Sequence, residues 1–130
     1  RRNHDHVAAL LDASPWLSVP APLAGEERAP DSIQFNLVGM NDTEVAAFSV
    51  EAGKRGVPVQ IFGGSADNAR AFWNWRFLGE IPDLPKTRAM LMRACDVRLP
   101  ARLTLDECDL VADALTAAAE AVKGTRRAVA

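Results

Sequence analysis

The sequence predicts an α+β fold, a small two-layer domain in which helices pack on a short, largely antiparallel sheet of about three strands and a long helix comes last. Residues 32–62 alternate apolar and polar side chains, then repeat apolar ones at helical spacing, then alternate again. Residues 104–123 hold an apolar stripe at helical spacing. Residues 1–130 are expected to form a single domain that buries its core without disulfides or metals.

An amphipathic helix is expected at the start of the chain and ends at Pro15. His4 and His6 lie on this helix. A His-x-His pair can bind a metal, but on a helix the two side chains point apart, so we expect both on a solvated face. The apolar residues at helical spacing are Val7, Leu10 and Leu11.

A connector and then the clearest strand follow. Residues 19–30 are proline-rich and acidic, which indicates an extended loop, and no chemistry is visible in them. Residues 32–38 alternate Ile33, Phe35 and Leu37 with polar residues. This is the pattern of a strand with one face on a core.

Local signals predict the next helix and strand. Asn41 and Glu44 form an approximate capping box, and Gly56 suits the left-handed residue that ends a helix. A short strand is expected over residues 57–62. Because proline cannot donate a ladder hydrogen bond, Pro58 indicates that this strand lies at an edge of the sheet or that the proline is at the start of the strand.

A turn and a short helix connect this strand to the last one. Residues 63–67 are glycine-rich but lack the spacing of a phosphate-binding loop, so we expect a turn. A helix is expected over residues 85–94, because proline suits the first helical position. Residues 95–100 are β-prone and closed by proline, which indicates a short edge strand.

The long helix has clear limits in the sequence. Thr104 and Glu107 form a second capping box, and Gly124 is expected to end the helix. Residues 125–130 are expected to be a frayed tail.

Composition bounds the class of protein. Cys95 and Cys108 have no paired spacing and are expected to be reduced, partly buried thiols, which favours a cytoplasmic location. A hydrophobic content of 48% without a long apolar run excludes a membrane-spanning helix and a membrane partner. Both histidines lie in the first helix, so a catalytic triad is excluded.

Charge is uneven along the chain. The whole chain has a net charge of -2, whereas residues 70–102 have a net charge of +4. A sequence pI near 5.7 and the lack of a basic run argue against nucleic acid, but the basic middle suits an anionic ligand or an acidic partner. Arg98 and Arg102 are expected to pair with buried carboxylates or helix ends, and Asp96 is an available partner.

The stretch 68–78 is the candidate site, because it combines two tryptophans with asparagines and arginines. It follows a glycine pair without a strong helix cap, so we expect a shaped, ordered loop. Its aromatic side chains could contact a neighbouring domain, a ligand or the chain's own core. Guanidinium groups suit the carboxylate of an amino donor or a sugar phosphate. The candidate substrate-binding or interdomain residues are Asn68, Arg70, Trp73, Asn74, Trp75 and Arg76.

The order of several motifs resembles the C-terminal small domain of DegT-type aminotransferases. The motifs are the aromatic Asn-Trp segment with its arginines, a Pro-Asp-Leu-Pro turn at residues 82–85, and the run 96–100 followed by Arg102-Leu-Thr104 and a helix containing Cys108-Asp109. The resemblance covers essentially the whole chain, and its most specific piece is residues 98–104.

The resemblance implies a homodimeric pyridoxal-phosphate enzyme of fold type I that aminates a keto sugar or cyclitol with an amino donor. Residues 1–14 would then be the interdomain helix. The resemblance places the Schiff-base lysine in a large domain that precedes this chain. Lys54, Lys86 and Lys123 of this chain lack the buried apolar setting that suits a reactive lysine. The domain would close over the active site, would carry no catalytic residue, cofactor or metal, and would be inactive alone.

A different class of protein fits the same residues. The chain could be a stand-alone α+β binding module that uses its basic aromatic patch to hold an anionic ligand or an acidic partner surface. The aromatic stretch could also be plain structural packing.

Overall fold

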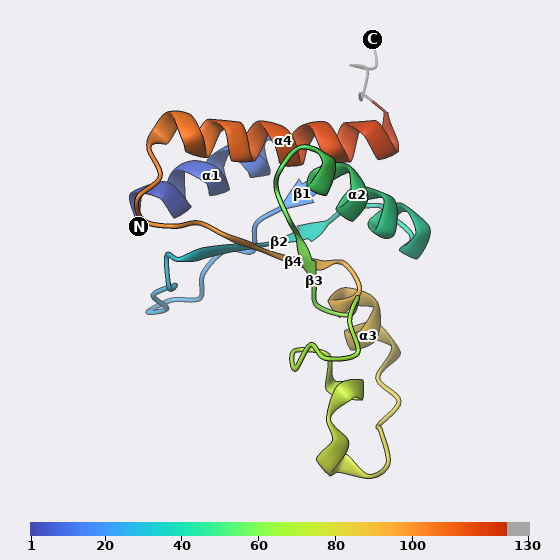
Figure 1. Cartoon of the computed structure of the whole chain (residues 1–130). Coiled ribbons are helices and arrows are strands. Elements are labelled where there is room, and N and C mark those ends of the chain that lie inside the picture. The colour runs from blue at the N-terminus through green and yellow to red at the C-terminus, as the bar shows by residue number, and fades with distance from the viewer. Residues whose placement is uncertain (125–130) are drawn as a thin grey trace.

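Helices cover one face of an antiparallel sheet, and an arm projects away from the other side (Figure 1). The structure is a computed structural model that describes residues 1–124, so the tail expected over 125–130 lies outside the described residues. The sheet order is β1-β2-β4-β3. The strands are β1 (Leu17–Ser18), β2 (Ser32–Leu37), β3 (Gln60–Ile61) and β4 (Ala94–Arg98), and the helices are α1 (Arg2–Asp12), α2 (Asp42–Lys54), α3 (Pro85–Leu91) and α4 (Leu105–Lys123).

The core lies between the sheet and the three helices α1, α2 and α4. Ile33, Phe35 and Leu37 of β2 are buried on the helix side, as their alternation predicts. The ring of Phe35 meets the ring of Phe48 from α2 edge to face, with 6.2 Å between centroids. The fold is therefore the predicted α+β arrangement of helices on a short antiparallel sheet.

The sheet differs from the prediction in three ways. β1 adds a fourth strand, which has only two residues and so no alternation to detect. β3 covers two of the six residues expected at 57–62, and it lies at the edge that Pro58 indicated. The expectation of an edge strand at 95–100 is wrong, because β4 pairs with both β2 and β3. Pro100 lies beyond the last paired residue, so it removes no ladder hydrogen bond.

Both predicted capping boxes form. The side chain of Asn41 accepts a hydrogen bond from the Glu44 amide at 2.9 Å, and Thr104 accepts one from the Glu107 amide at 3.2 Å. Gly56 follows α2 with φ of +83°, a left-handed conformation that favours glycine. α3 ends at Leu91, earlier than expected, because the chain enters β4 at Ala94.

The expected orientation of α1 is partly wrong. Val7 and Leu11 are buried as predicted, but Leu10 is exposed. His4, expected on a solvated face, is buried because the connector of residues 19–30 lies against this side of α1. His6 Nε2 is 2.6 Å from Asp109 Oδ1 of α4, so it joins the two helices.

Lys123 joins the end of α4 to the start of α2. Its ammonium donates to Glu44 Oε2 at 2.8 Å and to the carbonyl of Gly39 at 2.9 Å, and it lies 5.2 Å from the ring centroid of Trp16. The hydrogen bond from Lys123, with a smaller contribution from the Asn41 amide, lowers the pKa of Glu44 below its ordinary 4.5. A carboxylate with a lowered pKa stabilises the fold above its ordinary pKa, and this contribution is lost as the pH falls through the lowered value.

We therefore expect Lys123→Met to reduce the free energy of unfolding more at pH 7 than at an acidic pH, because the contribution of this ion pair is lost as the pH falls through the lowered pKa of Glu44. Urea titrations at the two pH values measure the difference. Lys54→Met is the matched control, because the partner of Lys54, Glu51, keeps its shorter contact with Arg55. A Lys123→Met effect that is the same at both pH values would contradict the prediction.

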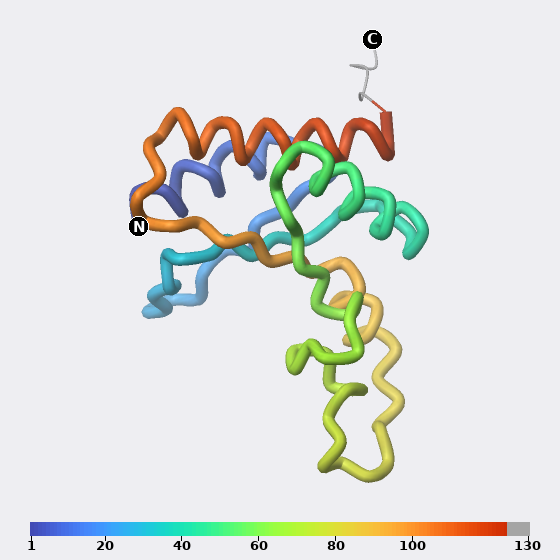
Figure 2. The backbone as a smooth tube through the Cα atoms, in the orientation of Figure 1, coloured from blue at the N-terminus to red at the C-terminus, as the bar shows by residue number. Residues whose placement is uncertain are grey.

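The segment between β3 and β4, residues 62–93, forms an arm (Figures 1 and 2). It leaves the sheet after Ile61, carries two short 3-10 turns, Phe72–Asn74 and Arg76–Leu78, and returns through α3 to β4. Figure 2 shows that the arm extends away from the three packed helices. The whole candidate stretch 68–78 therefore lies on a projection of the domain.

Candidate functional site

The candidate stretch is ordered by its own side chains. Asn74 Nδ2 donates to the carbonyls of Ser65 at 2.8 Å and Asn68 at 3.0 Å, and Trp75 Nε1 donates to the carbonyl of Ala69 at 2.6 Å. Asn68 is buried, and its Oδ1 accepts from the backbone amide two residues on at 2.9 Å. These bonds confirm the expected shaped, ordered loop. They also occupy polar side-chain groups that the sequence analysis considered as candidates for binding a substrate.

Trp73 lies in a small core inside the arm. Its ring meets that of Phe72 edge to face at 5.2 Å, and the Arg88 guanidinium lies 4.2 Å from its centroid. A β-carbon built on Gly63 would be 3.0 Å from Trp73 Cζ2 and would overlap the sulfur of Met92. The indole therefore fills a space that the arm leaves open only because residue 63 is glycine.

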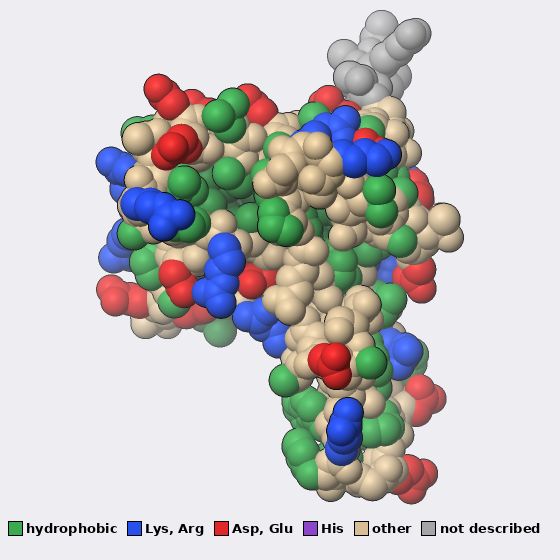
Figure 3. Space-filling model, in the orientation of Figure 1, with side chains coloured by type: hydrophobic (Ala, Val, Ile, Leu, Met, Phe, Trp, Pro, Cys, Tyr) green, Lys and Arg blue, Asp and Glu red, His purple; other side chains and the backbone are tan. Residues whose placement is uncertain are grey.

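Trp75 and Phe77 face outward instead. Their rings stack with 5.7 Å between centroids and an interplanar angle of 16°, and Phe77 is 81% exposed. Figure 3 shows hydrophobic side chains on the arm. Asn74, Trp75, Arg76 and Phe77 line a shallow hollow of about 290 Å³. The exposed large apolar residues of the arm are Trp75, Phe77, Leu78, Ile81, Leu84 and Met90.

Arg70 lies at the base of the arm, over the sheet. Its guanidinium is 4.5 Å from the ring centroid of Phe62 and 3.7 Å from Asp96 Oδ2. Asp96 is buried and faces Arg70 rather than Arg98. Arg98 is exposed and contacts the exposed Asp31 at 3.3 Å, so the expectation that it pairs with a buried carboxylate is wrong. The chain reversal in the arm brings Arg70 to Asp96, and spacing along the sequence carries no sign of that contact.

The structure thus divides the six candidate residues. Trp75 and Arg76 lie with Asn74 around the hollow, Trp73 packs inside the arm, and Asn68 and Arg70 lie toward its base. Phe77 was missed, although it stands two residues from Trp75 in the same stretch. The signal in the sequence was its position two residues from Trp75. Several aromatic residues in one short segment favour a docking surface when they are exposed.

Covalent and metal chemistry find little support among the described residues. Both cysteines are free and buried, and burial raises the pKa of both thiols, so the reactive thiolate is disfavoured. Residues 1–124 contain no group of three metal-ligating side chains and no helix long and apolar enough to cross a membrane.

Helices on one face of this sheet, with an arm between β3 and β4, form a fold that is similar to part of three solved structures. One similar structure is the aminotransferase TlmJ from Streptoalloteichus hindustanus, with a TM-score of 0.68 and 15% identity over 94% of this chain and 32% of that one. A second is 3-amino-5-hydroxybenzoic acid synthase, with a TM-score of 0.62 and 14% identity over 90% of this chain and 32% of that one.

A third similar structure is apo Spr1654 from Streptococcus pneumoniae, described as a sugar aminotransferase. It has a TM-score of 0.64 and 16% identity over 94% of this chain and 31% of that one. The chain thus spans about a third of the length of each structure. No protein-family model and no curated protein matches the sequence. The similarity confirms the fold that the sequence resemblance implied.

Proposed function

We propose that this chain is the C-terminal small domain of a homodimeric, pyridoxal-phosphate-dependent aminotransferase that acts on a keto sugar or cyclitol. The observation that carries the proposal is the coverage: the structures of two proteins described as aminotransferases and of one synthase match 90–94% of this chain with about a third of their own length. Helix α1, within residues 1–14, would connect to the large domain.

Pyridoxal phosphate supplies an electron sink for amino-group transfer when bound, but the residues of this chain do not fit it. Lys54 contacts Glu51 at the surface, and Lys86 is exposed. Lys123 donates to Glu44 and to a backbone carbonyl. None of the three lines a main hollow of the described residues. The proposal therefore places the cofactor and the reactive lysine in the large domain, and it makes this domain inactive alone.

The arm is the part of this domain that we assign to contact with the large domain. Trp75 and Phe77 present apolar area that a partner can desolvate, and Arg76 beside them is free to reach a substrate carboxylate or phosphate. Asn68, Asn74 and Trp73 shape the arm. A domain docked this way closes over the active site and excludes water from it.

The proposal predicts that the polypeptide made in cells is about three times as long as this chain, because this chain matches only about a third of each similar structure. Immunodetection with an antibody against residues 1–130 measures its size. The stand-alone binding module predicts a polypeptide of about this chain's own mass, 14.0 kDa, and that result would overturn the proposal.

A second expected result concerns the cofactor. Adding pyridoxal phosphate to the purified chain should give no new visible absorbance band that borohydride can fix, because Lys54 and Lys123 are ion-paired with glutamates and Lys86 is exposed. The full-length enzyme is the positive control. A reducible band whose cofactor mass maps to Lys54, Lys86 or Lys123 would contradict the assignment of the reactive lysine to another domain.

A further inference from the structure

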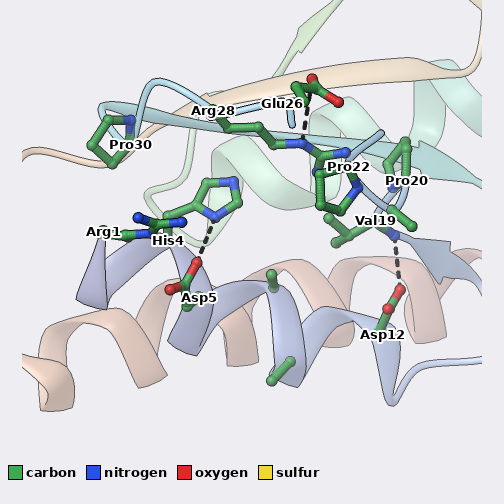
Figure 4. A pocket seen from close by; sticks show the side chains of 13 residues that line it. Arg1, His4, Asp5, Asp12, Val19, Pro20, Pro22, Glu26, Arg28 and Pro30 are labelled. Atoms are coloured by element: carbon green, nitrogen blue, oxygen red, sulfur yellow. Dashed lines mark hydrogen bonds and ion pairs between the residues drawn. The ribbon is translucent and has the colours of Figure 1, made fainter. Parts of the chain in front are cut away.

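The hollow between α1 and the connector of residues 19–30 has its charges paired within the domain (Figure 4). The Arg28 guanidinium lies 3.9 Å from the carboxylate of Glu26, which also lines the hollow. The carboxylate of Asp12 accepts a hydrogen bond from the Val19 amide at 2.8 Å. These charged groups therefore already have partners in the fold.

A different cleft lies at the edge of the sheet, where β3 ends and its partner β4 continues. β3 pairs with β4 only through Gln60 and Ile61, and the residues before it, 56–59, make no pair with β4. Figure 1 shows this segment crossing α4 before it descends to β3. The cleft has a volume of about 470 Å³, which is within the usual range for small-molecule sites.

The backbone of Arg98 faces this cleft. In an antiparallel ladder a residue directs its N–H and its C=O toward the same neighbouring strand, and the direction alternates along the chain. The Leu99 amide donates to the Asp31 carbonyl on the β2 side at 2.8 Å, so the backbone groups of Arg98 point to the other side. The register of β3 on that side puts Arg98 opposite Pro58.

Pro58 cannot complete the ladder, because it has no N–H to donate to the carbonyl of Arg98. The Arg98 amide does not bond to the Pro58 carbonyl either, and within residues 1–124 neither backbone group of Arg98 has a hydrogen-bond partner. The cleft therefore presents one donor and one acceptor side by side at an open strand edge. Such an edge is a template for another extended backbone.

The walls of the cleft are largely apolar. Its apolar lining residues are Val57, Pro58, Val59, Val97 and Val111. Val97 belongs to the buried core, so the cleft reaches between the sheet and α4. The two charged side chains that line it have partners, since Asp96 faces Arg70 and the Arg98 guanidinium contacts Asp31. A neutral ligand with an amide and an apolar group therefore suits the cleft better than an ion does.

From the open strand edge beside an apolar cleft, we infer that this cleft binds a short, neutral peptide amide with a small branched apolar end. The amide N–H of one ligand residue donates to the Arg98 carbonyl, and the C=O of the same residue accepts from the Arg98 amide. The group before that residue lies on the opposite face of the strand, the helix side, where Val97 and Val111 lie. This site goes beyond the proposed function and does not rest on it, since no residue of the arm takes part.

Isovaleryl-L-alanine methylamide and its ester analogue, isovaleryl-L-lactate methylamide, test the inference on the unmodified 130-residue chain. The ester has oxygen in place of the one N–H that pairs with Arg98, and it otherwise has nearly the same shape. NMR titrations should show the amide binding about threefold to tenfold more tightly, the difference that one hydrogen bond makes. The backbone amide signal of Arg98 should shift, because it gains a hydrogen bond.

Two valine substitutions separate the cleft from the rest of the surface. Val111→Thr keeps the shape of the side chain but puts a hydroxyl on the cleft wall, so it should weaken binding of the amide by about threefold. Val50→Thr is the matched control, because Val50 is exposed on α2 and should leave the affinity unchanged. The comparison of amide with ester needs no variant, so it decides the matter even where Val111→Thr lowers the thermal stability.

Three results would overturn the inference. Equal affinity for amide and ester excludes pairing with the backbone of Arg98. The absence of any shift at about 10 mM amide excludes the site itself. Shifts confined to residues outside the cleft place the ligand elsewhere. None of these results bears on the length of the polypeptide or on its cofactor, which test the proposed function.

Discussion

Replacing Phe77 with alanine should weaken the association of this chain with the large domain of the proposed enzyme by about tenfold to thirtyfold, the effect typical of an aromatic hot spot. Phe77 is 81% exposed and stacks only on Trp75, so its loss leaves no cavity in the domain. The unfolding transition of the isolated chain should therefore stay where it is. Calorimetry with the separately purified large domain measures the affinity.

The matched control is Leu110→Ala on α4. Leu110 is 69% exposed, and it lies on the helical layer rather than on the arm. This change should leave the affinity unaltered. Equal effects of the two substitutions would show that the arm is not the docking surface.

Trp73→Ala separates docking from folding of the arm. Trp73 packs between Phe72 and Arg88, so its truncation should loosen the arm as well as weaken docking. Hydrogen exchange of the amides in residues 62–93 reports this loosening. Phe77→Ala should leave that exchange unchanged.

Gly63→Ala should lower the free energy of unfolding by about 1–3 kcal/mol, the usual cost of overpacking a filled space. The added β-carbon would overlap Met92 Sδ and lie 3.0 Å from Trp73 Cζ2. Met92 Sδ is the nearer obstacle, and Trp73, which contacts Phe72 and Arg88, would also have to give way slightly. The base of the arm must shift, and its contact with β4 weakens.

A rescue variant tests this explanation. Combining Gly63→Ala with Met92→Ala makes room for the new methyl, so the two changes should cost less together than the sum of their separate effects. Gly53→Ala is the matched control, because a β-carbon at that position in α2 meets nothing within 4 Å. It should raise stability by about 0.5–1 kcal/mol, as alanine is the better helix former. Additive losses in the double variant would contradict the steric account.

Elements defined by local chemistry could be predicted from the sequence. The capping boxes at Asn41 and Thr104 form as expected, because a capping side chain meets an amide only three residues away. The alternation in residues 32–38 identified the buried face of β2, because the side chains of a strand alternate with period two. The ordered loop at 68–78 followed from the glycines before it and the aromatic residues in it.

Features that depend on distant neighbours could not be predicted. His4 looked solvated, since its burial depends on the connector returning over α1. β4 looked like an edge strand, since Pro100 carries no information about which strands flank residues 94–98. The role of Asn74 was also hidden, because its partners, the backbone carbonyls of Ser65 and Asn68, come near its side chain only after the arm folds.

By itself the sequence determined the class of the fold, the limits of its long helices and the stretch 68–78 that we propose as a functional surface. Each follows from periodicity or from contacts within one helical turn. Tertiary structure alone decided that Trp73 is internal while Trp75 and Phe77 face outward, that Arg70 meets Asp96, and that Arg28 and His4 share a hollow. These contacts depend on how the chain folds back between the residues involved. Composition and spacing along the sequence do not specify that path.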